Sequence, residues 1–246
     1  MFIGKRGVIL IICLSVFVYY KKCCKIIKVR GGIGNQMFQY AYGYALRKKN
    51  KINVIYDTSR FKDKNYIGHG GMLLNVFNTD TSAFSSKSIL DYLMTGSWYY
   101  FSYCQSSTFF NEFRDDILKI FTLKKSLDNN NQNMLNDIIS HKNSVSIHVR
   151  RGDYVGNERI RETIGVISME YYQKAIKLFN ELGYEDIHYY VFSDDIEWCK
   201  ENMTFVKPVT FVHINDEYHG YLDMWLMKHC RHNIITNSTL SWWGAY

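Results

Sequence analysis

The chain has 246 residues, of which 47% are hydrophobic and only one is proline, so it has enough apolar content for one or two cores and is not disordered. The net charge is +7, but no basic patch interleaved with aromatic residues appears on a recognisable module, and nucleic acid is not expected as a partner. The six cysteines are too few and too irregularly spaced for a disulfide scaffold, and no C-x-x-C metal spacing exists.

The amino-terminal segment contains an uncharged, mostly apolar run, Gly7 to Tyr20, with basic residues on both sides. A membrane span usually needs about 20 apolar residues, so this run suffices only if flanking lysines snorkel. A signal-peptide core has this length, but no small-residue cleavage site follows. We expect residues 1–24 to be a short uncleaved anchor that contacts the membrane through 7–20. The alternative is an extended reading frame ahead of a cytosolic protein.

The first predicted unit is a strand, a glycine turn and a helix between Lys25 and Asn50. Apolar residues precede the run Gly31-Gly32-Ile33-Gly34-Asn35-Gln36, and helically spaced apolar residues follow it. This order brings backbone N–H groups and a helix N-terminus up to a phosphate. Met37 stands where G-x-G-x-x-G has its third glycine, so an ordinary tight turn is the alternative.

The middle of the chain is less regular. A strand is predicted at 52–57, and the aromatic stretch from Phe84 to Phe121 shows no interpretable period. The polar patch 128–133 predicts an exposed turn or a helix start between two halves. We place the domain boundary near Ser140.

The next strand, 144–149, runs into His148-Val149-Arg150-Arg151-Gly152-Asp153-Tyr154. Arginine binds phosphate oxygens in a bidentate way, so two arginines at a strand end suggest a diphosphate site. The alternative is that Arg150 and Arg151 are solvated charges paired with Asp153.

From this strand onward, strands and helices alternate, which predicts a doubly wound sheet. A helix is expected from Ser168 to Leu182, stopped by Gly183. After a strand at 188–192, Asp194 and Asp195 open another helix, and we expect Asp194 to cap it. After a strand at 232–236, Asn237-Ser238-Thr239 offers hydroxyls and an amide to phosphate oxygens, with Ser238 or Thr239 as the helix N-cap.

Four of these segments together resemble the α-1,2-fucosyltransferases, glycosyltransferase family 11. Their residues are more similar to those of the bacterial members. The resemblance runs from about Lys25 to the last residue. The segments, in family order, are 31–41 (GGIGNQMFQYA), 148–154 (HVRRGDY), 192–195 (FSDD) and 237–245 (NSTLSWWGA).

The resemblance implies an α/β fold of the GT-B type, with two Rossmann-like halves facing a central cleft. Residues 25–140 would form the acceptor half and 141–246 the half that binds GDP-fucose. The implied reaction transfers L-fucose from GDP-β-L-fucose to the 2-hydroxyl of a galactose in a glycan, with inversion and without a cofactor or an obligatory metal. The lack of a D-x-D motif near a strand end agrees with a metal-free site.

The resemblance also implies roles for individual residues. Arg150 would be the essential diphosphate arginine, and Asp153 would hold the fucose or orient Arg150. His148 and Arg151 would shape the turn and the pocket. The remaining donor-binding residues would be Gly34, Asn35 and Gln36 against the phosphates, Asp194 and Asp195 in a loop beside the nucleoside, and Asn237, Ser238 and Thr239 as further phosphate contacts.

The general base is the least certain assignment. An inverting transfer to a hydroxyl needs a base within hydrogen-bond reach, and Asp153, Glu158 and Glu162 follow the arginines. Glu158 stands where related α-1,6-fucosyltransferases carry a catalytic glutamate, counted from His148, so it is the hypothesis here.

Two departures leave alternatives open. Relatives continue beyond Trp-Trp-Gly, whereas this sequence stops at Tyr246, so we expect an incomplete donor half. Transfer to another hydroxyl or acceptor, or a non-catalytic sugar-nucleotide-binding or glycan-binding remnant, are the alternatives. Three lysines after the apolar run against two basic residues before it favour the cytoplasmic face for the catalytic part, with the Golgi lumen or a soluble cytoplasmic protein as alternatives.

Overall fold

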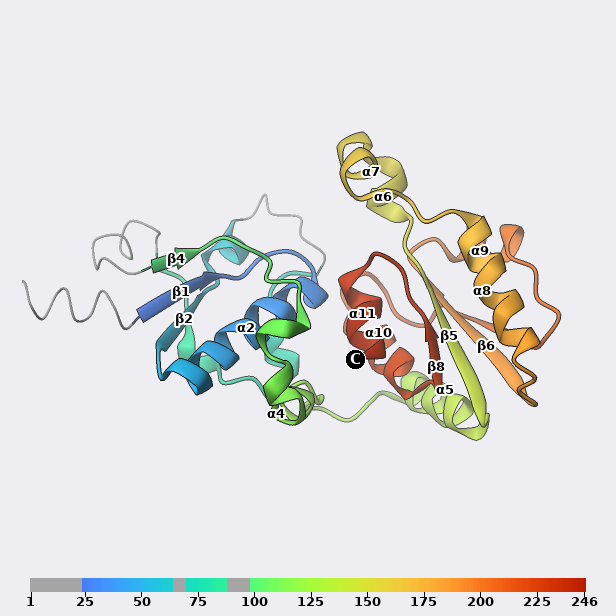
Figure 1. Cartoon of the computed structure of the whole chain (residues 1–246), viewed down its shortest axis with the longest axis horizontal. Coiled ribbons are helices and arrows are strands. Elements are labelled where there is room, and N and C mark those ends of the chain that lie inside the picture. The colour runs from blue at the N-terminus through green and yellow to red at the C-terminus, as the bar shows by residue number, and fades with distance from the viewer. Residues whose placement is uncertain (1–23, 64–69, 88–97) are drawn as a thin grey trace, which may run out of the picture. The chain divides into compact units, whose positions relative to one another are not determined.

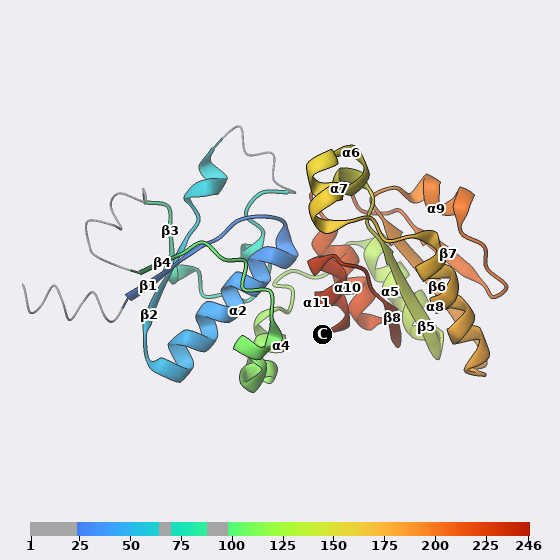
Figure 2. The same ribbon diagram turned by 45° about the horizontal axis from the view of Figure 1, so that its top comes forward.

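The structure is a computed structural model that describes residues 24–63, 70–87 and 98–246. The chain divides into two compact units, with the boundary between Lys124 and Lys125. The described residues of each unit contain one four-stranded parallel sheet (Figures 1 and 2). The α/β fold class predicted from the sequence is therefore confirmed.

The first unit is built on the strand order β3-β2-β1-β4. Its strands are β1 (Cys24–Lys28), β2 (Asn53–Asp57), β3 (Phe84–Ser85) and β4 (Trp98–Tyr100). Helix α2 (Ile33–Asn50) joins β1 to β2, and α4 (Arg114–Ile120) follows β4 after two single turns of 3-10 helix. The strand–turn–helix unit predicted at 25–50 is thus present.

Helix α2 lies very close to its sheet. Tyr40 stacks on Tyr56 with ring centroids 4.8 Å apart, and the Tyr56 hydroxyl donates to the Tyr40 carbonyl oxygen at 2.9 Å. A Cβ on Gly43 would stand 2.6 Å from the Tyr56 hydroxyl oxygen. Glycine at this position therefore permits the close approach of helix and sheet.

The second unit repeats the same topology, with the order β7-β6-β5-β8. Its strands are β5 (Asn143–Val149), β6 (Ile187–Ser193), β7 (Val209–Val212) and β8 (His232–Ile234). All seven residues of β5 are buried, including its polar residues Asn143, Ser144, Ser146 and His148, the last three of which alternate with Val145, Ile147 and Val149.

Helices cover both faces of the second sheet (Figures 1 and 2). One face carries α8 (Met169–Glu181) and α9 (Ile196–Asn202), whose side chains Tyr172, Ile176, Ile196 and Cys199 join the core formed with β5 and β6. The other face carries α5 (Asn129–Ser140), α10 (Gly220–His229) and α11 (Thr239–Ala245). The predicted helix 168–182 is confirmed, and Gly183 at its end has the positive φ of 72°.

The boundary between the units lies before α5, not near Ser140 as the sequence suggested. Helix α5 begins within the polar patch, capped by the Asp128 carboxylate, which accepts from the Asn131 N–H at 3.0 Å. The Asn131 and Asn215 amides exchange hydrogen bonds of 2.9 and 3.0 Å, and Asn215 also donates to Asp223 of α10 at 2.7 Å. These contacts place α5 in the second unit.

No helix among the described residues is long and apolar enough to cross a membrane. The predicted anchor, residues 7–20, lies outside the described part of the chain.

Candidate active site

The strand order of the second unit identifies where its ligand site belongs. Strands β6 and β7 lie on one side of β5, and β8 lies on the other. Open α/β sheets bind ligands beyond the carboxyl ends of the strands at the point where the order reverses, which here lies between β5 and β8. The segments that leave β5, β6 and β8 carry most of the predicted site residues.

Arg150 follows β5 directly and is held by two carboxylates. Its Nη2 donates to Asp153 Oδ1 at 2.7 Å, and its Nη1 lies 2.9 Å from Asp194 Oδ2. The side chain is 24% exposed, so the guanidinium is fixed in place and still open to solvent on part of its surface. The structure brings together Arg150, Asp153 and Asp194, which the sequence had assigned to one site.

Arg151 connects the β5 segment to helix α9. Its Nε donates to Asp195 Oδ2 at 3.0 Å, and its guanidinium carbon lies 3.6 Å from the Trp198 ring centroid, a cation–π contact. Its backbone N–H donates to Asp194 Oδ1 at 2.8 Å. These contacts stiffen the turn. Trp198 was not a predicted site residue. Its position in the first turn of the helix that follows the two aspartates could have indicated that it lies near the site.

The helix cap is Asp195 and not Asp194, which corrects the sequence-based expectation. Helix α9 starts at Ile196, so Asp195 is the N-cap, and its Oδ1 accepts from the Trp198 N–H at 3.4 Å. Because Asp194 lies one residue before the cap, its carboxylate points to the arginines instead.

Gly152 is required by this cluster, although its position in the sequence did not predict a role for it. It starts the short helix α6 (Gly152–Gly156), and a Cβ at this position would stand 2.6 Å from Asp194 Oδ2. Only glycine lets the β5 segment approach the Asp194 carboxylate this closely.

His148 is buried at the end of β5 and stays neutral. Burial lowers the pKa of the imidazole to about 3, with a further contribution from the positive charge of Arg150. Its Nδ1 has no hydrogen-bond partner among the described residues. A neutral buried ring supports the strand end sterically and brings no positive charge to a phosphate.

The residues after β8 form hydrogen bonds with other parts of the protein. Asn237 Nδ2 donates to the Ile164 and Gly165 carbonyl oxygens, both at 3.0 Å, and so ties this segment to the end of α7 (Glu158–Ile164). Ser238 is the N-cap of α11, with Oγ accepting from the Leu240 N–H at 3.4 Å, which confirms one of the two predicted caps. Thr239 is the first residue of that helix.

Glu158 lies in the first turn of α7, close in sequence to the Arg150 cluster. Its side chain is 79% exposed and 3.9 Å from Arg161. It is accessible to an acceptor, and no described contact fixes it beside Arg150.

In the first unit, the glycine-rich segment forms the predicted turn into α2. Gly31 has φ of 79°, and a Cβ there would stand 2.6 Å from Asn35 Nδ2. Gly34 is buried in the first turn of α2. Asn35 Oδ1 accepts from Gln105 Nε2 at 2.6 Å.

Gln36 is fully buried and links two loops. Its Nε2 donates to the carbonyl oxygens of Gly31 and Gly71 at 2.9 and 2.7 Å, and its Oε1 accepts from the Leu73 N–H at 2.9 Å. Both ends of the amide are used within the protein, so Gln36 supports the turn from beneath.

A buried carboxylate that was not among the predicted site residues, Asp57, lies at the end of β2. Asp57 is fully buried and accepts from Lys28 Nζ at 3.0 Å, from the Ser59 N–H at 2.8 Å and from the Tyr99 hydroxyl. Burial alone would raise the pKa of Asp57, but these hydrogen bonds together lower it. A lysine ending β1 beside an aspartate ending β2 was the available signal.

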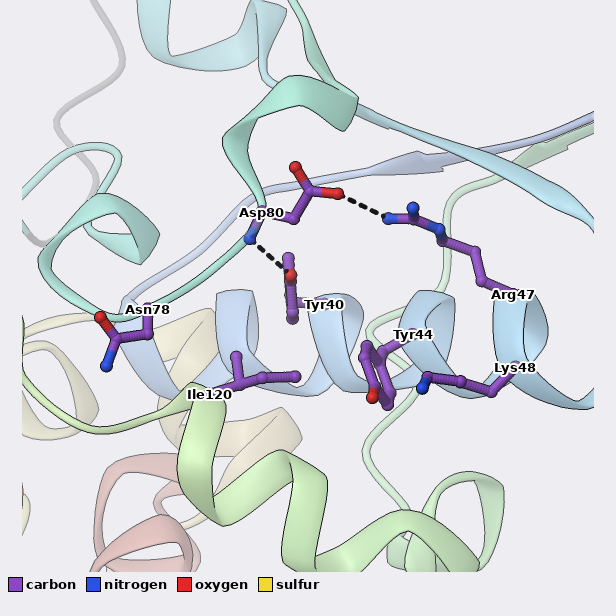
Figure 3. A pocket seen from close by; sticks show the side chains of 7 residues that line it. All are labelled: Tyr40, Tyr44, Arg47, Lys48, Asn78, Asp80 and Ile120. Atoms are coloured by element: carbon purple, nitrogen blue, oxygen red, sulfur yellow. Dashed lines mark hydrogen bonds and ion pairs between the residues drawn. The ribbon is translucent and has the colours of Figure 1, made fainter.

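A separate pocket of about 420 Å³ lies on the first unit between α2, the 78–80 segment and α4 (Figure 3). An Arg47–Asp80 ion pair of 3.1 Å crosses it, and the Asp80 N–H donates to the Tyr40 hydroxyl oxygen at 2.8 Å. It lies apart from every predicted site residue. Across 24–63, 70–87 and 98–246 no cluster of three or more His, Cys, Asp or Glu side chains could hold a metal ion.

Comparison with solved structures agrees with the fold. The fucosyltransferase NodZ from Bradyrhizobium is similar with a TM-score of 0.56 and 9% identity, over 89% of this chain and 91% of that one. NodZ co-crystallised with GDP, described as an α-1,6-fucosyltransferase, gives a TM-score of 0.57 at 10% identity over the same shares.

Comparison of sequences is more specific. The chain is 33% identical to an alpha-1,2-colitosyltransferase of Escherichia coli, over 89% of this chain and 86% of the relative. It is 32% identical to the O-antigen biosynthesis glycosyltransferase WbnK of the same species, over 88% and 87%. The galactoside 2-alpha-L-fucosyltransferase Sec1 of Mus musculus is 29% identical over 89% of this chain and 63% of its own length. The profile of glycosyl transferase family 11 matches residues 5–246, and the chain therefore belongs to glycosyl transferase family 11.

Proposed function

We propose that this glycosyltransferase transfers L-fucose from GDP-β-L-fucose to the 2-hydroxyl of a galactose residue in a glycan, with inversion and without an obligatory metal. Its family membership supports a transfer of this class, and the α-1,2 linkage follows the names of the E. coli colitosyltransferase and the mouse Sec1 enzyme. The residues of the Arg150 cluster supply the chemistry.

The observation that carries the proposal is the geometry of Arg150. A guanidinium has five N–H donors, and the two carboxylates Asp153 and Asp194 occupy one terminal nitrogen each. The remaining donors are free to bind oxygens of a diphosphate at the end of β5. Since the carboxylates fix the side chain before a ligand arrives, little reorganisation is needed at the moment of reaction.

In the proposed step, the bond between fucose C1 and the diphosphate oxygen breaks while the galactose O2 forms its bond to C1 from the opposite face. The electron pair of the broken bond leaves with GDP, whose added negative charge Arg150 stabilises. A general base accepts the proton of the galactose hydroxyl. Asp153 is engaged by Arg150, so the accessible Glu158 is the better candidate for that base.

The decisive test is Arg150→Ala, measured as GDP release from GDP-fucose with lactose as acceptor and EDTA present. Removing one preorganised donor to a developing anion typically costs about 100-fold or more in turnover. The matched control is Arg159→Ala, since Arg159 is an exposed arginine a few residues away in α7. Equal rates for the two variants would refute the role of Arg150. Activity that requires a divalent cation would refute the metal-free part.

Glu158 is tested in the same assay by Glu158→Gln, which keeps the shape of the side chain and removes the basic oxygen. A loss of about 100-fold in kcat, with little change in the KM for GDP-fucose, is expected of a general base. Normal turnover would transfer the role to another group.

Two alternatives have distinct outcomes in these experiments. Transfer with a donor carrying colitose, as the name of the E. coli relative suggests, would appear as faster release from that donor than from GDP-fucose. A binding remnant would bind GDP-fucose without releasing GDP in the presence of any galactoside.

A further inference from the structure

The first unit has its own point of strand-order reversal, between β1 and β4, and exposed aromatic residues gather there. In the order β3-β2-β1-β4, the segments that leave β1 and β4 meet at the carboxyl edge of the sheet. Figure 1 shows the green segment that leaves β4 running beside the blue segment between β1 and α2. Phe101 and Tyr103 in the green segment are 52% and 36% exposed.

These two aromatic residues are held in place and are not loose surface side chains. Phe101 packs on Tyr99 with ring centroids 4.5 Å apart. The guanidinium of Arg30, which follows β1, lies 4.4 Å from the Tyr103 ring centroid, and its Nη2 donates to the Phe101 carbonyl oxygen. One arginine thus fixes both the backbone and one ring of the segment.

Two amides lie beside these aromatic residues. Gln105 Nε2 donates to Asn35 Oδ1 at 2.6 Å, which links the β4 segment to the start of α2. Because Asn35 accepts through Oδ1 and Gln105 donates through Nε2, the bond between them leaves Asn35 Nδ2 and Gln105 Oε1 unused. They present one donor and one acceptor in fixed positions.

We propose that Asn35, Phe101, Tyr103 and Gln105 form a binding platform for a pyranose ring of the acceptor glycan, in place of the phosphate contact that the family resemblance implies for Asn35. A sugar presents an apolar C–H face, which an aromatic ring can cover, and hydroxyls at its edge that both donate and accept, which amides match. Arg30 holds the segment through the Phe101 carbonyl oxygen and the Tyr103 ring. This inference rests on the proposed function for the identity of the glycan as acceptor.

The kinetic test compares Phe101→Ala and Tyr103→Ala with the unmutated chain. The KM for lactose is expected to rise roughly three- to tenfold for each, as for the loss of one aromatic contact, with an unchanged KM for GDP-fucose. Tyr103→Phe keeps the ring and should behave as the unmutated chain. Phe109→Ala is the matched control, because Phe109 is 48% exposed and packs on Tyr42 instead.

Saturation-transfer NMR with lactose tests the platform without turnover, so it can succeed even if no fucose is transferred. Signals from lactose are expected with the unmutated full chain and with Phe109→Ala, and are expected to weaken strongly with Phe101→Ala. Unchanged lactose signals and an unchanged lactose KM for Phe101→Ala would overturn the inference. A rise in the KM for GDP-fucose alone would also overturn it and would assign the aromatic residues to the nucleobase. If the unmutated chain shows lactose signals that depend on Phe101 but transfers no fucose, the platform stands and the proposed function fails.

Discussion

Replacing Gly152 by alanine perturbs the Arg150 cluster without removing any of its charges. The added Cβ would meet Asp194 Oδ2 at 2.6 Å and Asp194 Cγ at 3.3 Å, so the carboxylate has to move. Asp194→Asn would be a less informative change, because it also removes a negative charge beside the proposed diphosphate. Gly152→Ala instead changes only the position of the Asp194 carboxylate and leaves its charge in place.

The magnitude follows from the contacts that the displaced carboxylate makes. Asp194 lies 2.9 Å from Arg150 Nη1 and accepts from the Arg151 N–H at 2.8 Å. A hydrogen bond to a charged group contributes about 1.5 to 3 kcal/mol, and partial exposure reduces that figure. We therefore expect a loss of about 1 to 2 kcal/mol in the positioning of Arg150, which corresponds to a decrease of roughly 5- to 30-fold in kcat/KM for GDP-fucose.

Gly156→Ala is the matched control, because both glycines belong to α6 and the space around Gly156 is open, with nothing within 4 Å of its Cβ position. Neither glycine has a positive φ, so alanine is allowed by the backbone at both positions. The assay measures kcat/KM for GDP-fucose together with GDP binding by calorimetry. If the two alanine variants agree within about twofold in both measurements, Asp194 does not position Arg150 and the reasoning is refuted.

Two further predictions concern stability. Asp57→Asn leaves the partly buried Lys28 ammonium without its charged partner and should lower the free energy of unfolding by about 2 to 3 kcal/mol in urea titration. Asp80→Asn breaks an exposed pair and should cost at most about 1 kcal/mol, and similar losses for the two variants would contradict this reasoning. Burial lowers the pKa of His148 in the folded protein to about 3, below the ordinary histidine pKa of about 6.5, so the unfolded state binds the proton first. Stability that is present above pH 6.5 is therefore lost as the pH falls toward 3. Between pH 6.5 and 5 this loss should approach about 2 kcal/mol, and a His148→Asn variant with the same pH dependence would contradict the assignment.

The parts of the fold that the sequence predicted are those with a strong period or a buried strand. Strand β5 shows an alternating pattern, with Val145, Ile147 and Val149 at every second position, and the arginines that follow it could be placed at a strand end for that reason. Helix α8 was clear from its amphipathic spacing and its glycine stop.

The aromatic stretch after residue 84 could not be interpreted, for a physical reason. Its described parts contain the short strands β3 and β4 and two single turns of 3-10 helix, 107–109 and 111–113. Elements this short show no hydrophobic repeat. Three residues of the proposed glycan platform, Phe101, Tyr103 and Gln105, lie in this stretch, and their position beside Asn35 became visible only when the sheet order brought β1 and β4 together.

The roles within the site depended on contacts between distant residues. The sequence shows two adjacent aspartates, but only the starting residue of α9 decides that Asp195 caps the helix while Asp194 reaches the arginines. Gln36 likewise belongs to the glycine-rich motif, yet its partners Gly71 and Leu73 are distant in the sequence.

The shared strand order also constrains how the protein can be made on the ribosome. In each unit the first strand to be synthesised, β1 or β5, has its second neighbour supplied by the last strand, β4 or β8. Until β8 emerges, one edge of β5 has unpaired backbone groups, and such an edge can pair with another chain. Strand β5, which positions Arg150, therefore keeps an unpaired edge and a risk of misassembly until the residues of β8 have been translated.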